Sequence, residues 1–572
     1  MATAYGYILH YSIHLPALAM GTALDIGTVA RAILSARCLQ SSAPDGIGLQ
    51  AAPQQGAKGN LSKNKGNIVQ LKGLLFFTQK DSNTPFTTPM NLRKTLLLLA
   101  VALCTNGYAQ ENTTEAEAAK PVKKEIVKKG YNFGPLPAVA FDADKGFQLG
   151  ALLNIFDFGD GSTYPNPRQQ WYFEASFFTK GSQLFVVTYD NKFLIPGVRW
   201  SSNFTLTNDK AMDFYGFNGY MSHYDHERVA LGKDKENHND YIYSPKYRMN
   251  RLALLFKSDF TGNIAGNKFF WIAGYHLSYF QQGYNKERAL NLDKINKNKE
   301  EYKQFPENEP TIFDQYRKWG IIPEDEVWGG LNSTLRLGLL FDTRDKEAAP
   351  SKGIWAEAHV SLAPKWLGTT KPFYRYSATF RQYVPIVKND ILTFAYRLNY
   401  EGTFGKSAPH YVLPFITVMG STYDRDGMGG YRTVRGLMRN RVQGLDMATY
   451  NVELRWRFVK FALWKQNIAF GLNIFSDGTM VTRNYDISFK ATEQQLGTEY
   501  QNVKAEYDNY MSKGLSKDRP HITAGAGLRF IMNQNFIVAF EYGLPISKFS
   551  KDPIIKNQDG NGAFYINTGY LF

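Results

Sequence analysis

The last nine residues of the chain alternate as a β-strand would and end on an aromatic side chain. One face of this strand would carry Phe564, Ile566, Thr568, Tyr570 and Phe572. An exposed edge strand that ends on bare aromatics invites aggregation of a soluble protein. The last strand of a membrane barrel can instead present such a face to lipid and seat its aromatics at the interface. We therefore predict the closing strand of a transmembrane β-barrel, with the terminal strand of a soluble sandwich as the alternative.

The overall composition also favours a membrane barrel. The chain has 572 residues, of which 44% are hydrophobic and 15% aromatic, yet its mean hydropathy is -0.36. This value is too polar for a bundle of membrane helices, and no apolar run approaches the roughly 20 residues that a spanning helix needs. Barrels combine high aromatic content with moderate polarity, because only alternate residues face lipid.

A secretory signal peptide is predicted at residues 90–109. A positive start at Arg93 and Lys94 precedes a short leucine-rich core and small residues up to Ala109, after which cleavage would leave Gln110 first. Residues 1–89 show no sustained period, so we interpret them as a mistaken upstream extension. An unusually long targeting extension is the alternative. Residues 110–130 are polar and charged, and we expect a short disordered lead before a barrel at residues 131–572.

Charge and cysteine content limit the partners and the chemistry. The formal net charge is +15, but basic and acidic residues are interspersed and no basic helix is present, so we predict no nucleic-acid binding. The two cysteines, Cys38 and Cys104, lie upstream of the predicted cleavage site. The mature protein would therefore have no disulfide and no reactive thiol.

Strand-like segments recur from residue 131 to the end of the chain. About sixteen are predicted, an even number, as a single-chain outer-membrane barrel requires. Their approximate ranges are 135–141, 146–157, 170–179, 182–191, 198–207, 248–258, 269–281, 331–342, 353–363, 374–384, 390–401, 446–458, 466–477, 520–531, 535–543 and 563–572.

Side-chain alternation and loop lengths predict which way the wall faces. At 450–458 the apolar Tyr450, Leu454 and Trp456 alternate with Glu453 and Arg455. Charged residues on one face and large aromatics on the other favour a polar lumen with lipid outside. Long gaps after the fifth, seventh, eleventh and thirteenth segments alternate with short turns. We expect the long loops outside the cell and the amino terminus in the periplasm, since outer-membrane barrels place short turns there.

The loop before the twelfth segment contains the motif Val434-Arg435-Gly436, followed by Leu437. Here the chain resembles the BamA/TamA-type outer-membrane assembly factor superfamily, the surface-antigen barrel domain. That family has sixteen strands, and its sixth extracellular loop folds into the lumen with a Val-Arg-Gly-aromatic tip. Leu437 departs from the aromatic. The stretches Phe341-Asp342-Thr343-Arg344-Asp345, Gly525-Ala-Gly527-Leu-Arg529 and Tyr542-Gly-Leu-Pro545 are also similar to the family.

The resemblance implies lumen partners for Arg435. The family's strand acids would fall on Glu453 and Asp477, both at inward positions of their strands. The planar guanidinium group suits a carboxylate bidentately, so the pair would pin the loop inside the barrel, whereas a solvated loop arginine is the alternative. Family members usually carry periplasmic POTRA domains, and residues 110–130 are too short for one, so we expect a member without them.

The family further implies a non-enzymatic role in insertion or translocation of proteins through a lateral seam. Expected partners are outer-membrane lipids, unfolded outer-membrane protein clients and a periplasmic or membrane partner protein. A passive pore or transporter for small solutes or lipids is the alternative function. An outer-membrane enzyme ranks third, because His276 and Ser278 share an inward face. No cofactor is expected, and His223 and His226 more often mark a solvated loop than a metal site.

Overall fold

The computed structural model describes residues 11–13, 127–142, 146–164, 166–179, 181–231, 244–284, 310–347, 349–388, 390–414, 427–463, 466–532, 536–568 and 570–572. The predicted signal peptide and most of residues 1–89 and 110–130 lie outside these ranges, so their assignments stay predictions. Within the described residues, no helix has both the length and the apolar character to cross a membrane.

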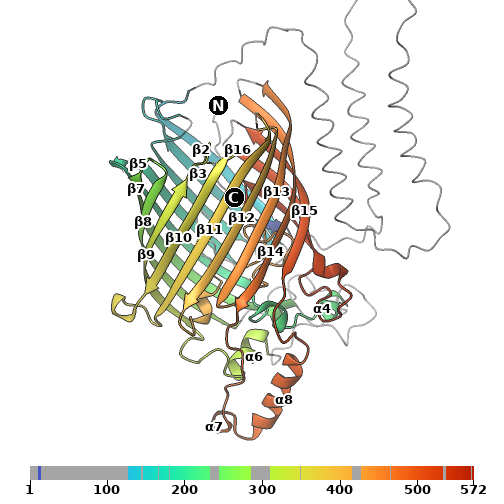
Figure 1. Ribbon diagram of the computed structural model, residues 1–572. Coiled ribbons are helices and arrows are strands. Elements are labelled where there is room, and N and C mark those ends of the chain that lie inside the picture. Colours follow the sequence, from blue (N-terminus) through green and yellow to red (C-terminus); the bar gives the residue numbers. More distant parts are fainter. Residues whose placement is uncertain are drawn as a thin grey trace, which may run out of the picture. The chain divides into compact units, whose positions relative to one another are not determined.

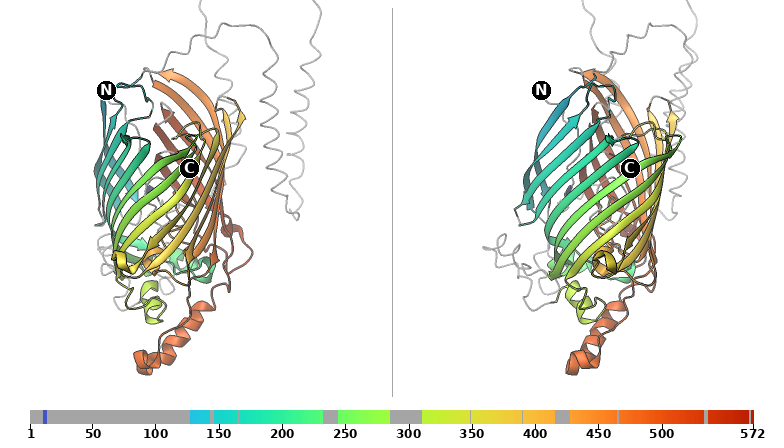
Figure 2. Two further views of the ribbon diagram at one scale, coloured as in Figure 1. Left: turned by 60° about the vertical axis from the view of Figure 1, so that its left-hand side comes forward. Right: turned by 90° about the vertical axis from the view of Figure 1, so that its left-hand side faces the viewer.

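The described residues form one antiparallel sheet that curves into a barrel (Figures 1 and 2). A three-residue strand, β1 (Tyr11–Ile13), is followed by sixteen wall strands, as the alternation predicts. These are β2 (Tyr131–Asp142), β3 (Gly146–Asp157), β4 (Gln169–Phe178), β5 (Gln183–Ile195), β6 (Val198–Asp213), β7 (Arg248–Ala265), β8 (Phe269–Tyr284), β9 (Gly329–Asp342), β10 (Gly353–Ala363), β11 (Phe373–Val387), β12 (Leu392–Phe404), β13 (Asp446–Leu463), β14 (Gln466–Arg483), β15 (His521–Met532), β16 (Phe536–Pro545) and β17 (Ala563–Thr568).

The wall has one discontinuity, which we call the seam. Residue-by-residue pairing joins consecutive strands from β2 through to β17. No such register joins β17 to β2 in the part of the chain that the structure describes. The outer edge of β17 pairs instead with β1, whose Tyr11 lies opposite Ile566. The sheet is therefore not closed by a continuous ladder.

The wall is apolar outside and polar inside. Leu339, Leu398 and Leu528 are exposed, whereas Arg397 and Arg529, which neighbour two of them in sequence, are buried. A soluble barrel would show the opposite arrangement, because its apolar side chains would fill the interior. This pattern confirms the prediction of a polar lumen surrounded by an outer face suited to lipid.

Long connections gather at one end of the barrel, which we call the loop end; the other is the turn end. The short connections β5–β6, β7–β8, β11–β12, β13–β14 and β15–β16 lie at the turn end. The loop end carries short helices that include α4 (His226–Leu231), α6 (Ile312–Lys318), α7 (Glu493–Leu496) and α8 (Tyr500–Met511). In Figure 1, α6, α7 and α8 lie beyond the ends of the strands, and α7 and α8 together project farthest.

Candidate functional site

The candidate site lies where the β12–β13 connection, called loop 6 here, enters the lumen. Its residues 427–445 fold back on themselves through the isolated bridges Met428 to Val442 and Gly430 to Val434. The side chains beside the motif form a small buried apolar cluster with the wall. The cluster comprises Met428, Val434, Leu437, Val442, Met447 and Val481. Leu437, at the family's aromatic position, therefore serves as a packing residue.

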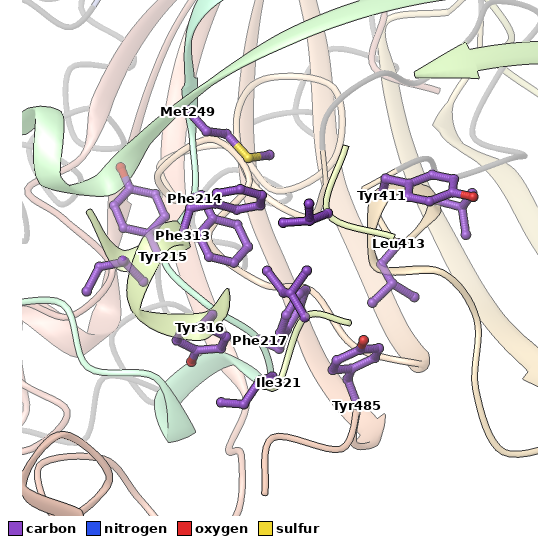
Figure 3. Packing of buried hydrophobic residues seen from close by; sticks show 14 of the residues in the cluster. Phe214, Tyr215, Phe217, Met249, Phe313, Tyr316, Ile321, Tyr411, Leu413 and Tyr485 are labelled. Atoms are coloured by element: carbon purple, nitrogen blue, oxygen red, sulfur yellow. The ribbon is translucent and has the colours of Figure 1, made fainter. Parts of the chain in front are cut away.

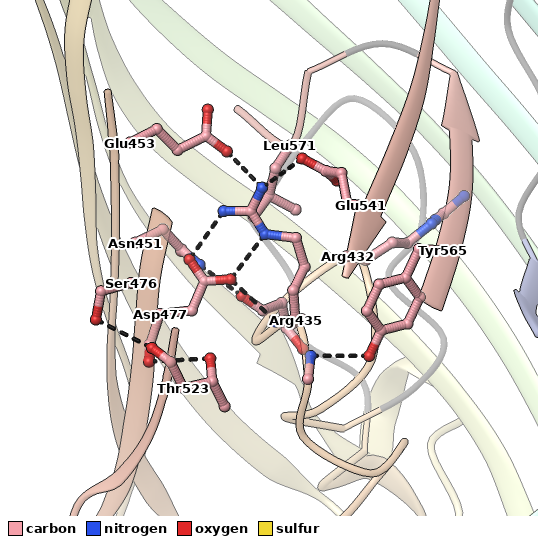
Figure 4. Close-up of polar contacts among 12 residues, drawn as sticks. Arg432, Arg435, Asn451, Glu453, Ser476, Asp477, Thr523, Glu541, Tyr565 and Leu571 are labelled. Carbon is pink, nitrogen blue, oxygen red and sulfur yellow. Dashed lines mark hydrogen bonds and ion pairs between the residues drawn. The ribbon is translucent and has the colours of Figure 1, made fainter. Parts of the chain in front are cut away.

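Arg435 extends from the tip of loop 6 to Asp477 on β14 in a bidentate pair (Figure 4). Its Nε donates to Oδ2 at 2.8 Å and its Nη2 donates to Oδ1 at 3.0 Å. The backbone N–H of Arg435 also donates to Asp477 Oδ2, at 3.0 Å. The ring of Phe475 lies 3.6 Å from the guanidinium carbon. Both charged side chains are 0% exposed, so their ion pair has no competition from bulk water.

The third nitrogen of the guanidinium group contacts two further carboxylates. Nη1 of Arg435 lies 2.6 Å from Glu453 on β13 and 2.8 Å from Glu541 on β16. Glu453 also accepts from Arg455 Nε at 2.6 Å, and Glu541 accepts from Arg529 at 2.8 Å. Three cations and three anions therefore form one neutral buried network. The structure places both sequence-predicted acids at Arg435.

Sequence reasoning missed Glu541, Arg455 and Arg529 as members of this network. Each occupies an inward position on its strand, which alternation could reveal. However, alternation does not say which inward residues of β13, β15 and β16 lie at the same height in the barrel. That depends on the register between strands, and the pairing places Glu541 opposite Gly527 and Arg529 opposite Ala539.

Gly436 brings the loop backbone against the wall. Its φ of +92° lies in the left-handed region, and a methyl group on its α-carbon would come within 2.6 Å of the Gly543 backbone on β16. Its N–H donates to the hydroxyl of Tyr565 on β17 at 2.9 Å. Only glycine fits both the conformation and the space. Loop 6 thus contacts β13, β14, β16 and the last strand.

Two more arginines attach loop 6 to other parts of the barrel. Arg439 pairs with Asp213 at the end of β6, with Nε 2.9 Å from Oδ2, and more weakly with Asp209 at 3.4 Å. Arg441 is 0% exposed and donates to backbone carbonyls in two other loops, those of Gly219 and Gln558, at 3.0 and 2.8 Å. The loop therefore connects opposite parts of the wall across the lumen.

Aromatic side chains from several long loops form a buried apolar core over the loop end (Figure 3). Tyr316 in α6 and Trp319 just after it are 0% exposed. Phe217 from the β6–β7 connection is also 0% exposed. Tyr485 from the β14–β15 connection packs against Phe217 with 4.4 Å between ring centroids and the rings tilted by 41°. We call this packed layer the dome. It is a hydrophobic core in its own right, since buried aromatics each remove large apolar areas from water.

Polar contacts strengthen the dome beside Arg441. His521 bonds Asp559 at 2.7 Å and Asp518 at 3.0 Å, and its ring stacks on Tyr220 with centroids 3.8 Å apart. The pKa of the Asp559 carboxyl is lowered: burial raises it, but the neighbouring His521 and Arg441 charges together outweigh burial. Asp559 therefore stays ionised and binds loops together.

The end of the chain departs from the predicted closing strand. β17 stops at Thr568, and Tyr570 and Phe572 lie inside the lumen instead of facing lipid. Arg455 lies 4.2 Å from the Tyr570 ring and donates to the Phe572 carbonyl at 2.8 Å. Phe564 and Ile566 lie on β17 as predicted, on the face of the strand away from the buried Tyr565.

The residues considered for other chemistry have different partners. His276 bonds Asp259 at 2.9 Å, and Ser278 accepts from Asn332 at 3.2 Å, so this histidine and serine are engaged separately. Within the described residues, no group of three or more His, Cys, Asp or Glu side chains is placed to hold a metal ion.

Comparisons with known proteins gave one family match and several similar solved structures. A sequence model of the Omp85 superfamily domain matches residues 170–572. Among solved structures, BamA from Haemophilus ducreyi lacking POTRA domains 1-3 is similar, with 14% identity, a TM-score of 0.41, and coverage of 77% of this chain and 70% of that one. CdiB from Escherichia coli matches with 8% identity, a TM-score of 0.42, and coverage of 77% and 62%.

A second CdiB, from Acinetobacter baumannii, gives 12% identity, a TM-score of 0.38, and coverage of 77% and 60%. The chain thus spans less than two thirds of the length of the CdiB chains. A comparison with curated proteins gave no match. The sequence match covers most of the chain, including β4 from its second residue, every later strand and all of loop 6. The protein belongs to the Omp85 superfamily of outer-membrane β-barrels.

Proposed function

We propose that this protein acts non-enzymatically in the insertion or translocation of proteins at the outer membrane. Client strands would add at the seam between β2 and β17, where backbone groups can pair with an incoming strand by β-augmentation. The match to the Omp85 superfamily domain supports this role. A strand entering lipid needs every backbone group satisfied, and an open sheet edge can supply partners.

Two observations together carry the proposal: the dome covers the loop end, and no backbone pairing between β2 and β17 is described at the seam. Among the described residues, twenty-seven pack into the dome core, including Phe313, Trp319 and Leu413, each at most 1% exposed. A passive pore needs a wet path along the barrel axis, which a packed apolar layer opposes. The wall offers an alternative opening at the seam, where no ladder is described.

Loop 6 supplies the rigid element that this mechanism requires. If the seam separates, β16 and β17 must move without collapse of the lumen. Arg435 ties the loop to β13, β14 and β16 through Glu453, Asp477 and Glu541. We infer that these pairs hold the carboxy-terminal half of the wall together as one body beside the seam.

The proposed orientation follows from the position of the loops. With the loop end outside the cell, the start of β2 and the end of β17 lie at the periplasmic face, where unfolded clients arrive. Outer-membrane lipids would contact the exposed apolar belt, including Leu337 and Trp456. A periplasmic or membrane protein could deliver clients at the turn end.

Reconstitution tests the function directly. The purified barrel in liposomes should accelerate folding of a urea-unfolded eight-stranded outer-membrane barrel, measured by heat-modifiable migration, with little ionic conductance. Arg435→Ala should reduce this acceleration. Arg432→Ala, in the same loop but with a partly exposed side chain that bonds Tyr431, should not. High conductance with no acceleration of folding would contradict insertion and support the alternative pore.

A further inference from the structure

Proline is distributed unevenly over the barrel wall. In the described strands, it occurs as Pro135 and Pro137 in β2, as Pro385 in β11 and as Pro545 in β16. Pro545 is the last residue of its strand, and Pro385 adjoins a register irregularity near the end of β11. Because proline has no N–H, sheets confine it to edges, strand ends and bulges. Pro135 and Pro137 lie in the middle of a twelve-residue strand, so they mark β2 as an edge.

Hydrogen bonds at the start of β2 show which way its backbone groups point. Successive residues of an antiparallel strand direct their N–H and C=O groups to opposite sides. The carbonyl of Gly130 accepts from the N–H of Phe158, at 3.0 Å, across the β2–β3 pair. Even-numbered residues pair with even-numbered residues in this ladder, as Gly134 does with Asn154. Even-numbered residues of β2 therefore face β3.

Hydrogen bonds between β3 and β4 independently show which residues of β2 face β3. The carbonyl of Phe147 accepts from Thr179 at 2.9 Å, so odd-numbered residues of β3 face β4 and even-numbered ones face β2. The odd-numbered Pro135 and Pro137 consequently direct their backbone groups away from β3, toward the seam. Each offers a carbonyl there but no N–H. The seam-facing edge of β2 thus lacks two successive hydrogen-bond donors.

The missing donors leave a long gap. The N–H groups that flank it belong to Phe133 and Val139, six residues apart, or about 20 Å at roughly 3.3 Å per residue. A strand lying along β2 would leave its own carbonyls opposite the prolines unpaired. In lipid no water can replace the missing donors, so each unpaired carbonyl is energetically costly. β2 is therefore a poor template for a neighbouring strand.

The other edge of the seam is different. β17 contains no proline, and its edge carries an added strand in this structure. That strand, β1, comes from the segment that the predicted cleavage would remove, so it occupies the place that an incoming strand would take. β1 pairs antiparallel with it, with Ser12 opposite Tyr565 and Ile13 opposite Phe564. The same fold thus presents one edge that accepts a strand and one that lacks donors.

We propose that the two edges of the seam have different roles: β2 is the releasing edge, and an added strand is hydrogen-bonded to β17. The assignment to β17 rests on the proposed function, because it concerns the strand of a client protein. The weakness of the β2 edge does not depend on that function. The two parts can therefore be tested separately.

Restoring the donors tests the β2 edge. The variant P135V/P137V should close the seam more firmly and raise the temperature at which the folded, heat-modifiable form is lost in liposomes. Pro385→Val is the matched control, since it also adds a donor but lies far from the seam, and it should give no rise. Removing prolines alone stabilises the unfolded chain and lowers stability. An unchanged or lowered temperature for P135V/P137V would therefore overturn the weak-edge assignment.

Photo-crosslinking tests the acceptor edge. A benzoylphenylalanine at position 564 on β17 or at position 133 on β2 replaces one aromatic residue with another. With a urea-unfolded eight-stranded barrel as the probe, adducts should form at 564 and be several-fold weaker at 133. Stronger adducts at 133 would overturn the assignment of β17. Adducts at neither position, while P135V/P137V still raises the temperature, would overturn strand addition as the function but keep the weak β2 edge.

Discussion

Removing the Arg435 side chain should destabilise the barrel more than any other single change in loop 6. Asp477 receives three contacts from Arg435, from the backbone N–H, Nε and Nη2, at 2.8–3.0 Å. Arg435→Ala would leave this carboxylate buried without its cation. Glu453 and Glu541 would keep Arg455 and Arg529. Breaking a buried pair from one side costs about 3–5 kcal/mol, much of it from the uncompensated charge.

A double-mutant cycle separates the orphaned charge from the lost contacts. Adding Asp477→Ala to Arg435→Ala removes the unpaired carboxylate and should recover about 1–3 kcal/mol of that loss. The free energy of unfolding would be measured by urea titration in lipid vesicles with tryptophan fluorescence. Arg432→Ala, the control in the same loop, should lie within about 0.5 kcal/mol of wild type. Equal losses for Arg435→Ala and Arg432→Ala, or no coupling between Arg435 and Asp477, would refute the buried-network account.

Three further changes test other parts of the structure. Gly543→Ala should loosen loop 6 and lower the urea midpoint of unfolding, because the added methyl group would lie 2.8 Å from backbone atoms of the loop. The control Gly471→Ala should lower the midpoint less, because its methyl group would meet no atom closer than 3.1 Å. Tyr570→Ala should lower the yield of heat-modifiable barrel in the outer membrane, whereas Tyr570→Phe keeps the cation–π contacts, worth about 1–2 kcal/mol. The pKa of Asp559 is lower in the folded protein than its unfolded value of about 4, so its charge stabilises the dome fully above about pH 4. That stabilisation is lost as the pH falls through the folded pKa. Asp559→Asn should therefore make proteolysis of the loops less dependent on acid pH.

The sequence predicted the wall well because side-chain alternation is a local property. All sixteen predicted segments correspond to strands, and the alternation at 450–458 places Glu453 and Arg455 inward as expected. Strand ends were less predictable. β14 continues to Arg483, beyond the predicted 477, because backbone pairing with β13 persists past the apolar stretch.

Longer-range features could not be read from alternation. The assignment of Glu541 to Arg435 needs the register of four strands, and the inward turn of Tyr570 depends on arginines more than 40 residues earlier in the chain. Period-two alternation alone extends the last strand to Phe572. The long loops also carry local helix signals: Val503, Tyr507 and Tyr510 recur at helical spacing in α8, and Thr311 with Asp314 forms the capping box of α6.

Locking the seam tests the central claim most directly. Cysteines at positions 133 on β2 and 564 on β17 would be joined by cleavable thiol crosslinkers of increasing length, because no register fixes their separation. The control pair at Leu337 and Val360 joins β9 and β10, which are already paired opposite each other. We predict that the seam crosslink abolishes accelerated folding of the unfolded eight-stranded barrel, that cleavage restores it, and that the control crosslink has no effect. Undiminished acceleration with the seam locked would contradict a lateral route.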